Sequence, residues 1–118
     1  MNCGIEVLKR FNEMIDIDLN EVIERLEHKV TENGLNMYDL YCELNQVVKC
    51  YAVSSLKLID QTPFIAFIGF DSFGHYVLVE KIDQYVHIYD PSNKYKKMTK
   101  LHFYMIWSKK AIILCYNK

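Results

Sequence analysis

The sequence lacks a stretch of apolar residues long enough to cross a membrane. Its longest apolar run lies around Pro63–Phe70, whereas a membrane-spanning helix needs roughly 20 consecutive apolar residues. The first residues, Met-Asn-Cys-Gly-Ile-Glu, also lack the pattern of a signal peptide. We therefore expect an intracellular protein that does not itself insert into a membrane.

The sequence also lacks an excess of basic residues and any zinc-type motif. The net charge is -1 and no basic stripe is visible, so we do not expect nucleic acid as a partner. The four cysteines form no C-x-x-C pair and have no zinc spacing with the histidines. Their even number permits two disulfides, but without a secretory signal we expect reduced thiols, and we expect no cofactor.

What is present indicates one folded domain. A chain of 118 residues that is 51% hydrophobic can bury a core of its own. Helical spacing of apolar residues predicts three helices, over 3–15, 19–30 and 37–46. We expect Asp18 and Glu21 to form a capping box at the second helix, and Asn36 to cap the third.

Strand patterns follow the helices. We expect strands over 47–53, 64–70, 75–82, 85–90 and 111–116, a turn at 71–74, a loop at 91–97, and a short helix from Thr99 to about Trp107. Helices first and strands afterwards predict an α+β fold. In it, N-terminal helices (about 3–46) pack on a C-terminal antiparallel sheet (about 47–116).

The two strands on either side of Asp83-Gln84 carry the first candidate site residues. If those two residues form the loop, Ile82 faces Tyr85, and paired residue numbers sum to 167. Residues two apart on a strand share a face. His75 and Asp90 are then diagonal neighbours on one face, roughly 7–8 Å apart at the backbone. A histidine and a carboxylate so placed are typical of a general base and the group that orients it.

On the other face, the same register places His87 across from Glu80. We interpret these two residues as a surface pair.

Cys3 is the candidate nucleophile. It lies at the start of the first predicted helix, where free N–H groups and the helix dipole favour a thiolate. Gly4 beside it allows close approach of another backbone. A Cys-Gly at a helix start, followed far downstream by His, is the papain-type order. The three residues predict acyl transfer through a thioester, although a buried structural cysteine in an unrelated α+β domain is the simpler alternative.

Several segments, in this chain order, resemble the C39 peptidase domain. This is the papain-like cysteine protease domain of bacteriocin-processing ABC transporters. The segments are Asn2-Cys3-Gly4, Asn33-Gly34-Leu35-Asn36-Met37-Tyr38-Asp39-Leu40, Pro63-Phe64-Ile65-Ala66, His75-Tyr76-Val77-Leu78-Val79, Tyr89-Asp90-Pro91 and Ile106-Trp107. The likeness covers nearly all of residues 1–118, read as a single domain.

The resemblance implies a papain-like fold with Cys3 as nucleophile, His75 as base and Asp90 as orienter. It implies cleavage of leader peptides after a double-glycine motif during export of bacteriocins and other peptides. The leader is expected to bind as an amphipathic helix in an apolar groove. An ABC exporter, in the same chain or separate, is the expected partner, and the inner face of the membrane the expected location.

The sequence departs from the family in one respect. Family members carry a glutamine about six residues before the cysteine, which donates a hydrogen bond to the oxyanion. Only Met1 and Asn2 precede Cys3 here, and Gln46, Gln61 and Gln84 are remote in the sequence. Loss of such a donor costs about 10²–10³ in turnover. The alternative function is therefore a catalytically impaired domain that binds the leader for an exporter.

Overall fold

The computed structural model describes residues 2–15, 17–32, 34–69, 75–92 and 94–115. Its helices are α1 (Cys3–Met14), α2 (Asn20–Glu27), α3 (Met37–Leu44) and α4 (Lys100–Ile106). Its strands are β1 (Cys50–Ser54), β2 (Phe64–Ile68), β3 (His75–Ile82), β4 (Tyr85–Asp90), β5 (Lys94–Thr99) and β6 (Trp107–Leu114). The predicted turn at 71–74 lies outside the described residues.

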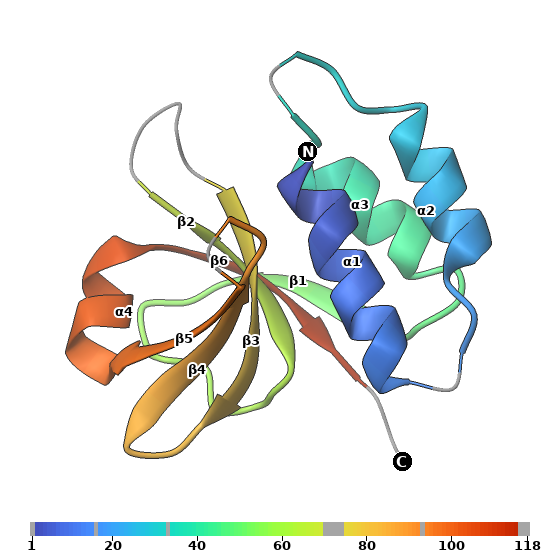
Figure 1. Cartoon of the computed structure of the whole chain (residues 1–118). Coiled ribbons are helices and arrows are strands. Elements are labelled where there is room, and N and C mark those ends of the chain that lie inside the picture. Colours follow the sequence, from blue (N-terminus) through green and yellow to red (C-terminus); the bar gives the residue numbers. More distant parts are fainter. Residues whose placement is uncertain (1, 16, 33, 70–74, 93, 116–118) are drawn as a thin grey trace.

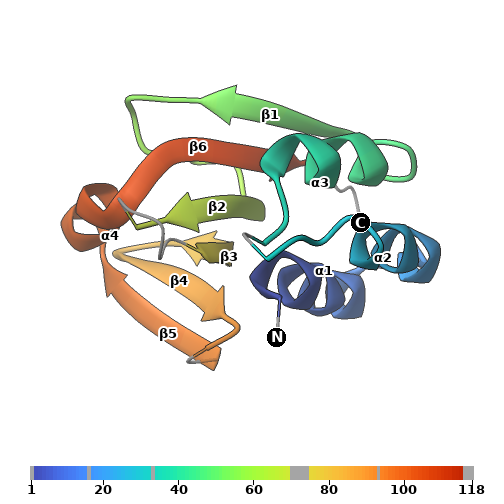
Figure 2. The same cartoon turned by 90° about the horizontal axis from the view of Figure 1, so that it is seen from above.

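The strands form one antiparallel sheet in the order β1-β6-β2-β3-β4-β5. Helices α1, α2 and α3 lie on one side of it, and α4 lies at the far side, next to β5 and β6 (Figures 1 and 2). The predicted α+β architecture, with N-terminal helices packed on an antiparallel sheet, is confirmed. Among the described residues, no helix is both long and apolar enough to cross a bilayer.

Each face of the sheet has its own apolar core, because successive residues of a strand point to opposite faces. Ile65 and Leu78 face the three N-terminal helices, whereas Phe64 and Val77 face the other way. The first core is completed by helix residues such as Leu8, Phe11, Leu26 and Leu40. The second is completed by Val79, Val86, Ile88, Phe103 and Trp107. The central strands are therefore covered on both faces.

The start of α2 differs from the prediction. The N-cap is Leu19, and the Asp18 carboxylate accepts a hydrogen bond from the Asn20 N–H, so Asp18 and Glu21 do not form the predicted capping box. The Asn12 side-chain oxygen, from the end of α1, accepts the Leu19 N–H at 2.7 Å. This contact between helices competes successfully with the local cap.

The prediction of a loop over 91–97 is wrong for the second half of that segment. Residues 94–99 form β5, in which Lys94 pairs with Asp90 and Lys96 pairs with Ile88. Three lysines obscure the strand pattern in the sequence. They are accommodated because β5 is an edge strand, and charged residues are common there.

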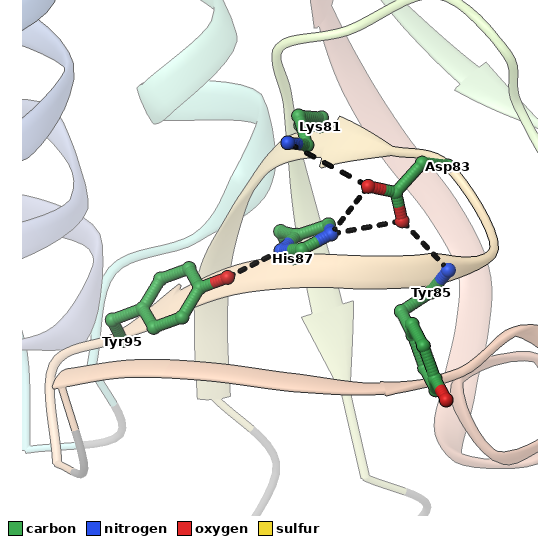
Figure 3. Close-up of polar contacts among 5 residues, drawn as sticks. All are labelled: Lys81, Asp83, Tyr85, His87 and Tyr95. Atoms are coloured by element: carbon green, nitrogen blue, oxygen red, sulfur yellow. Dashed lines mark hydrogen bonds and ion pairs between the residues drawn. The ribbon is translucent and has the colours of Figure 1, made fainter.

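The β3–β4 turn is one residue longer than predicted. Ile82 pairs with Val86 rather than with Tyr85. The Asp83 N–H donates to the Tyr85 carbonyl, and the Asp83 carboxylate accepts the Tyr85 N–H (Figure 3). A bulge then restores the predicted register, because β3 has one extra residue at Glu80.

His87 therefore does not form the predicted surface pair with Glu80. Its backbone pairs with Lys81, its Nε2 lies 2.9 Å from an Asp83 carboxylate oxygen, and its Nδ1 meets the Tyr95 hydroxyl (Figure 3). The Tyr85 N–H and His87 lower the pKa of Asp83 to about 2. This cluster joins the turn to β5 at a distance from the candidate site.

Candidate active site

His75 and Asp90 meet at one end of the sheet. His75 is the first residue of β3 and Asp90 is the last residue of β4, its antiparallel neighbour. Beyond the bulge at Glu80, the pairs Leu78–Tyr89 and Val79–Ile88 follow the predicted register. His75 Nε2 lies 3.1 Å from Asp90 Oδ2. The predicted contact between the two side chains is confirmed.

Asp90 is a fully buried carboxylate with several partners. The Ser92 N–H donates to Oδ1 at 2.9 Å, and Lys96 Nζ lies 3.3 Å from Oδ2. Burial acts to raise the pKa of Asp90, but hydrogen bonds from Ser92, His75 and Lys96 outweigh burial and lower it. An ionised carboxylate can only accept hydrogen bonds. The proton of neutral His75 is therefore on Nε2, and Nδ1 is left to act as the base.

Cys3 is the first residue of α1, as predicted. Asn2 caps the helix, because its side-chain oxygen accepts the Ile5 N–H at 3.0 Å. The Cys3 thiol is partly exposed and not disulfide-bonded. It lies where the helix dipole stabilises negative charge. A thiol in this position is accessible to a substrate carbonyl.

Gly4, in the first turn of α1, lies against Tyr76, near the start of β3. A Cβ atom at Gly4 would lie 3.4 Å from Tyr76 Cδ2 and 3.0 Å from Leu35 Cδ2, so Gly4 makes room for neighbouring side chains rather than for the predicted backbone. Tyr76 directly follows His75. Burial, and after it the charge of a Cys3 thiolate, raises the pKa of Tyr76 to about 12. Within the described residues, however, the Cys3 thiol makes no hydrogen bond to His75.

Tyr76 and Lys96 are site residues that the sequence analysis missed. The Tyr76 hydroxyl donates to the Leu35 carbonyl at 2.9 Å and so ties β3 to the segment before α3. Lys96 lies in the segment predicted as a loop, 91–97. Side chains alternate between the two faces of a strand. If 94–99 is treated as a strand that pairs with β4, this alternation places Lys96 on the same face as Asp90.

A cavity of about 580 Å³ opens beside Tyr76. Its walls come from α3, β2 and β6, and include Met37, Phe67, Trp107, Lys109 and Lys110. Lys109 donates to the Tyr104 and Trp107 carbonyls, so its ammonium is held at the end of α4. The lining combines apolar side chains with lysines, and it includes Tyr76, the residue that follows His75 in β3.

The profile of the Peptidase C39 family matches residues 1–118. None of the curated protein sequences matches significantly.

Two solved structures share the fold. One is a double glycine motif protease from an AMS/PCAT transporter in complex with its leader peptide (TM-score 0.79, 18% identity, covering 96% of this chain and 83% of that one). The other is the peptidase domain of Streptococcus ComA, a bi-functional ABC transporter involved in quorum sensing (TM-score 0.76, 21% identity, covering 98% and 92%).

Proposed function

Because the chain belongs to the peptidase C39 family, we propose that it is a cysteine endopeptidase that cleaves leader peptides after a double-glycine motif. The observation that carries the proposal is the contact of 3.1 Å between His75 Nε2 and the buried Asp90 carboxylate. This contact leaves His75 Nδ1 as the proposed base at the first residue of β3, beside the helix start that bears Cys3.

The proposed reaction is acyl transfer. His75 Nδ1 takes the thiol proton, and the Cys3 sulfur attacks the carbonyl carbon of the scissile bond. The C–N bond breaks as His75 protonates the leaving amine, which leaves a thioester. Water then attacks the thioester, gives a proton to His75 and releases the carboxylic acid, and the proton returns to Cys3. Asp90 fixes the His75 tautomer throughout.

The backbone N–H of Cys3 is the proposed oxyanion donor. It belongs to the first turn of α1, where backbone N–H groups have no acceptor within the helix. One donor of this kind is worth about 10²–10³ in turnover.

The substrate and partner follow from the same family. The leader-bound relative makes a leader peptide the proposed substrate here. The cavity beside Tyr76 is proposed to take its apolar side chains. Both structural relatives come from transporters, so the proposed partner is an ABC exporter, at the cytosolic face of the membrane.

Cleavage of a synthetic double-glycine leader peptide, followed by mass spectrometry, tests the proposal. We expect the wild type to cut after the second glycine and Cys3→Ala to be inactive. We expect Asp90→Asn to lose about 10²–10⁴ in kcat, because the base is no longer oriented. Cys42→Ala is the control, since Cys42 lies on α3, and it should cleave like the wild type. Cleavage by Cys3→Ala would refute the mechanism.

A second function is favoured by the missing hydrogen bond between the Cys3 thiol and His75. In this alternative, the domain captures the leader for an exporter but cleaves it poorly. The same observation is compatible with the first function, because catalytic hydrogen bonds are often long in a free enzyme and tighten with substrate. Leader binding measured by calorimetry, without cleavage by the wild type, would establish the second function over the first.

A further inference from the structure

Arg10 of α1 and Glu80 of β3 form a two-point ion pair. Arg10 Nε lies 2.6 Å from Glu80 Oε2, and Arg10 Nη2 lies 3.2 Å from Glu80 Oε1. The Glu80 side chain is only 13% exposed, and the Arg10 guanidinium also lies over the Tyr89 ring, 5.5 Å from its centroid. A bidentate pair of this kind is directional, because both partners are planar.

The two partners lie on the elements that carry the proposed nucleophile and base. Arg10 follows Cys3 by seven residues, which is about 10 Å along α1 and nearly two turns, so the two residues share a helix face. Glu80 follows His75 on β3 and is the extra residue of the bulge. Near the site, α1 and β3 already touch where Gly4 meets Tyr76. The ion pair is a second contact between the same two elements.

Two separated contacts between α1 and β3 fix the position and the rotation of α1 on the sheet, which apolar packing alone does not specify. Packing of α1 on the sheet is dominated by side chains such as Leu8 and Phe11, and hydrophobic attraction has no preferred direction. Contacts of this kind do not by themselves specify how far α1 slides along the sheet or how it rotates about its axis. The Arg10–Glu80 pair opposes both movements, because its two hydrogen bonds hold one guanidinium edge against one carboxylate.

We infer that Arg10 and Glu80 are positioning residues that set the distance between the Cys3 sulfur and the His75 imidazole. The inference rests on the proposed function for its catalytic readout. It assigns neither residue a contact with the substrate. It predicts that breaking the pair lowers the rate of the chemical step and the reactivity of Cys3 while leaving substrate binding intact.

The chain contains a matched control. Arg25 of α2 binds Glu43 of α3, with Nε 2.7 Å from Oε1. The exposures are similar: 41% and 8% for Arg25 and Glu43, against 35% and 13% for Arg10 and Glu80. The control pair joins two helices that carry no proposed catalytic residue. Loss of Arg25 removes an ion pair of similar exposure without releasing α1 from β3, while Lys29 Nζ stays 3.0 Å from the Glu43 carboxylate.

The first measurement is steady-state cleavage of the double-glycine leader peptide, at a temperature where thermal unfolding shows every variant to be folded. We expect Arg10→Met to lower kcat by about 10- to 100-fold, because displacement of a reacting group by about 1 Å has effects of this size. KM should stay within about twofold of wild type, a change equivalent to less than about 0.5 kcal/mol. Glu80→Gln should behave like Arg10→Met, and Arg25→Met should keep both constants near the wild-type values.

The second measurement does not depend on cleavage. Peptide mapping after brief treatment with iodoacetamide gives the alkylation rate of Cys3, with Cys42 as an internal reference. We expect Arg10→Met to slow alkylation of Cys3 relative to Cys42, and Arg25→Met to leave the ratio unchanged. If the wild type fails to cleave but this ratio changes as expected, the proposed function fails and the positioning inference stands.

Arg10→Lys is the conservative variant, which keeps the charge but makes a single point contact. We expect the kcat of Arg10→Lys to lie between those of wild type and Arg10→Met. If Arg10→Met does not fold, Arg10→Lys replaces it in both measurements. Equal kcat and equal Cys3 alkylation in the Arg10 and Arg25 variants would overturn the inference. A rise in KM without a fall in kcat would overturn it as well.

Discussion

At the scale of single residues, the candidate site depends on the groups that contact the Asp90 carboxylate. Its Oδ2 atom has both His75 and Lys96 as neighbours, while Oδ1 accepts the Ser92 N–H. These partners together keep the carboxylate ionised despite complete burial. The hydrogen bond from Lys96 is thus one of the contacts that lower the pKa of Asp90.

Replacement of Lys96 by Met should raise the pKa of Asp90, because the hydrogen bond from Lys96 lowers it. A carboxylate with a raised pKa is protonated at a higher pH, and protonated Asp90 no longer accepts the Nε2 proton of His75 in the same way. We expect the acid limb of the kcat/KM profile to move to higher pH. Lys97→Met is the control, because Lys97 Nζ lies over the Tyr85 ring instead. An acid limb that stays in place or moves to lower pH would contradict this account of Lys96.

At the scale of elements, the starts of the helices show what local sequence determines. Asn36 and Thr99 cap α3 and α4 as predicted, because each side chain bonds an N–H only three residues away. Such a contact depends on adjacent residues alone. The predicted cap at Asp18 was wrong because Leu19 is held by Asn12, a contact between separate elements.

Some contacts of the strands were also predictable from local sequence, and others were not. The His75–Asp90 contact was predictable because alternation fixes which residues share a face. The bulge at Glu80 was not predictable from alternation, and neither was the longer turn at Asp83. Arg10 binds Glu80 across the interface of α1 with the sheet, a contact for which the sequence has no local pattern. The placement of Cys3 relative to His75 thus depends on contacts that the sequence does not reveal.

The Asn2 cap of α1 can be tested as an element. Asn2→Ala removes the acceptor for the Ile5 N–H, and we expect the free energy of unfolding to fall by about 1 kcal/mol. Asn2→Asp keeps an acceptor and adds negative charge at the helix start, so its stability should stay near that of wild type. Urea denaturation followed by circular dichroism measures both. Equal destabilisation by the two substitutions would show that the cap is not the source of the effect.

At the scale of the whole molecule, the helical layer is joined internally by charge as well as by apolar packing. The Glu43 carboxylate of α3 contacts Arg25 Nε at 2.7 Å and Lys29 Nζ at 3.0 Å. Hydrogen bonds from these two side chains hold the pKa of Glu43 below its usual value, and the pKa of buried Asp90 is lowered as well. Glu43 in the helices and Asp90 in the sheet both have a lowered pKa, and they therefore link the stability of the fold to pH.

Because the pKa of Glu43 is lower in the folded state than in the unfolded chain, its ion pairs stabilise the fold at neutral pH. This stabilisation is lost as the pH falls through the lowered pKa. We expect Glu43→Gln to be less stable than wild type by about 1 kcal/mol at pH 7, since both cationic partners are partly exposed. The difference should shrink toward zero as the pH falls through the lowered pKa, where wild-type Glu43 also loses its charge. Urea unfolding at pH 7 and at a series of lower pH values measures this, with exposed Glu24→Gln as the control. A difference that stays constant over the whole series would mean that the shape of the side chain, rather than its charge, holds α2 against α3.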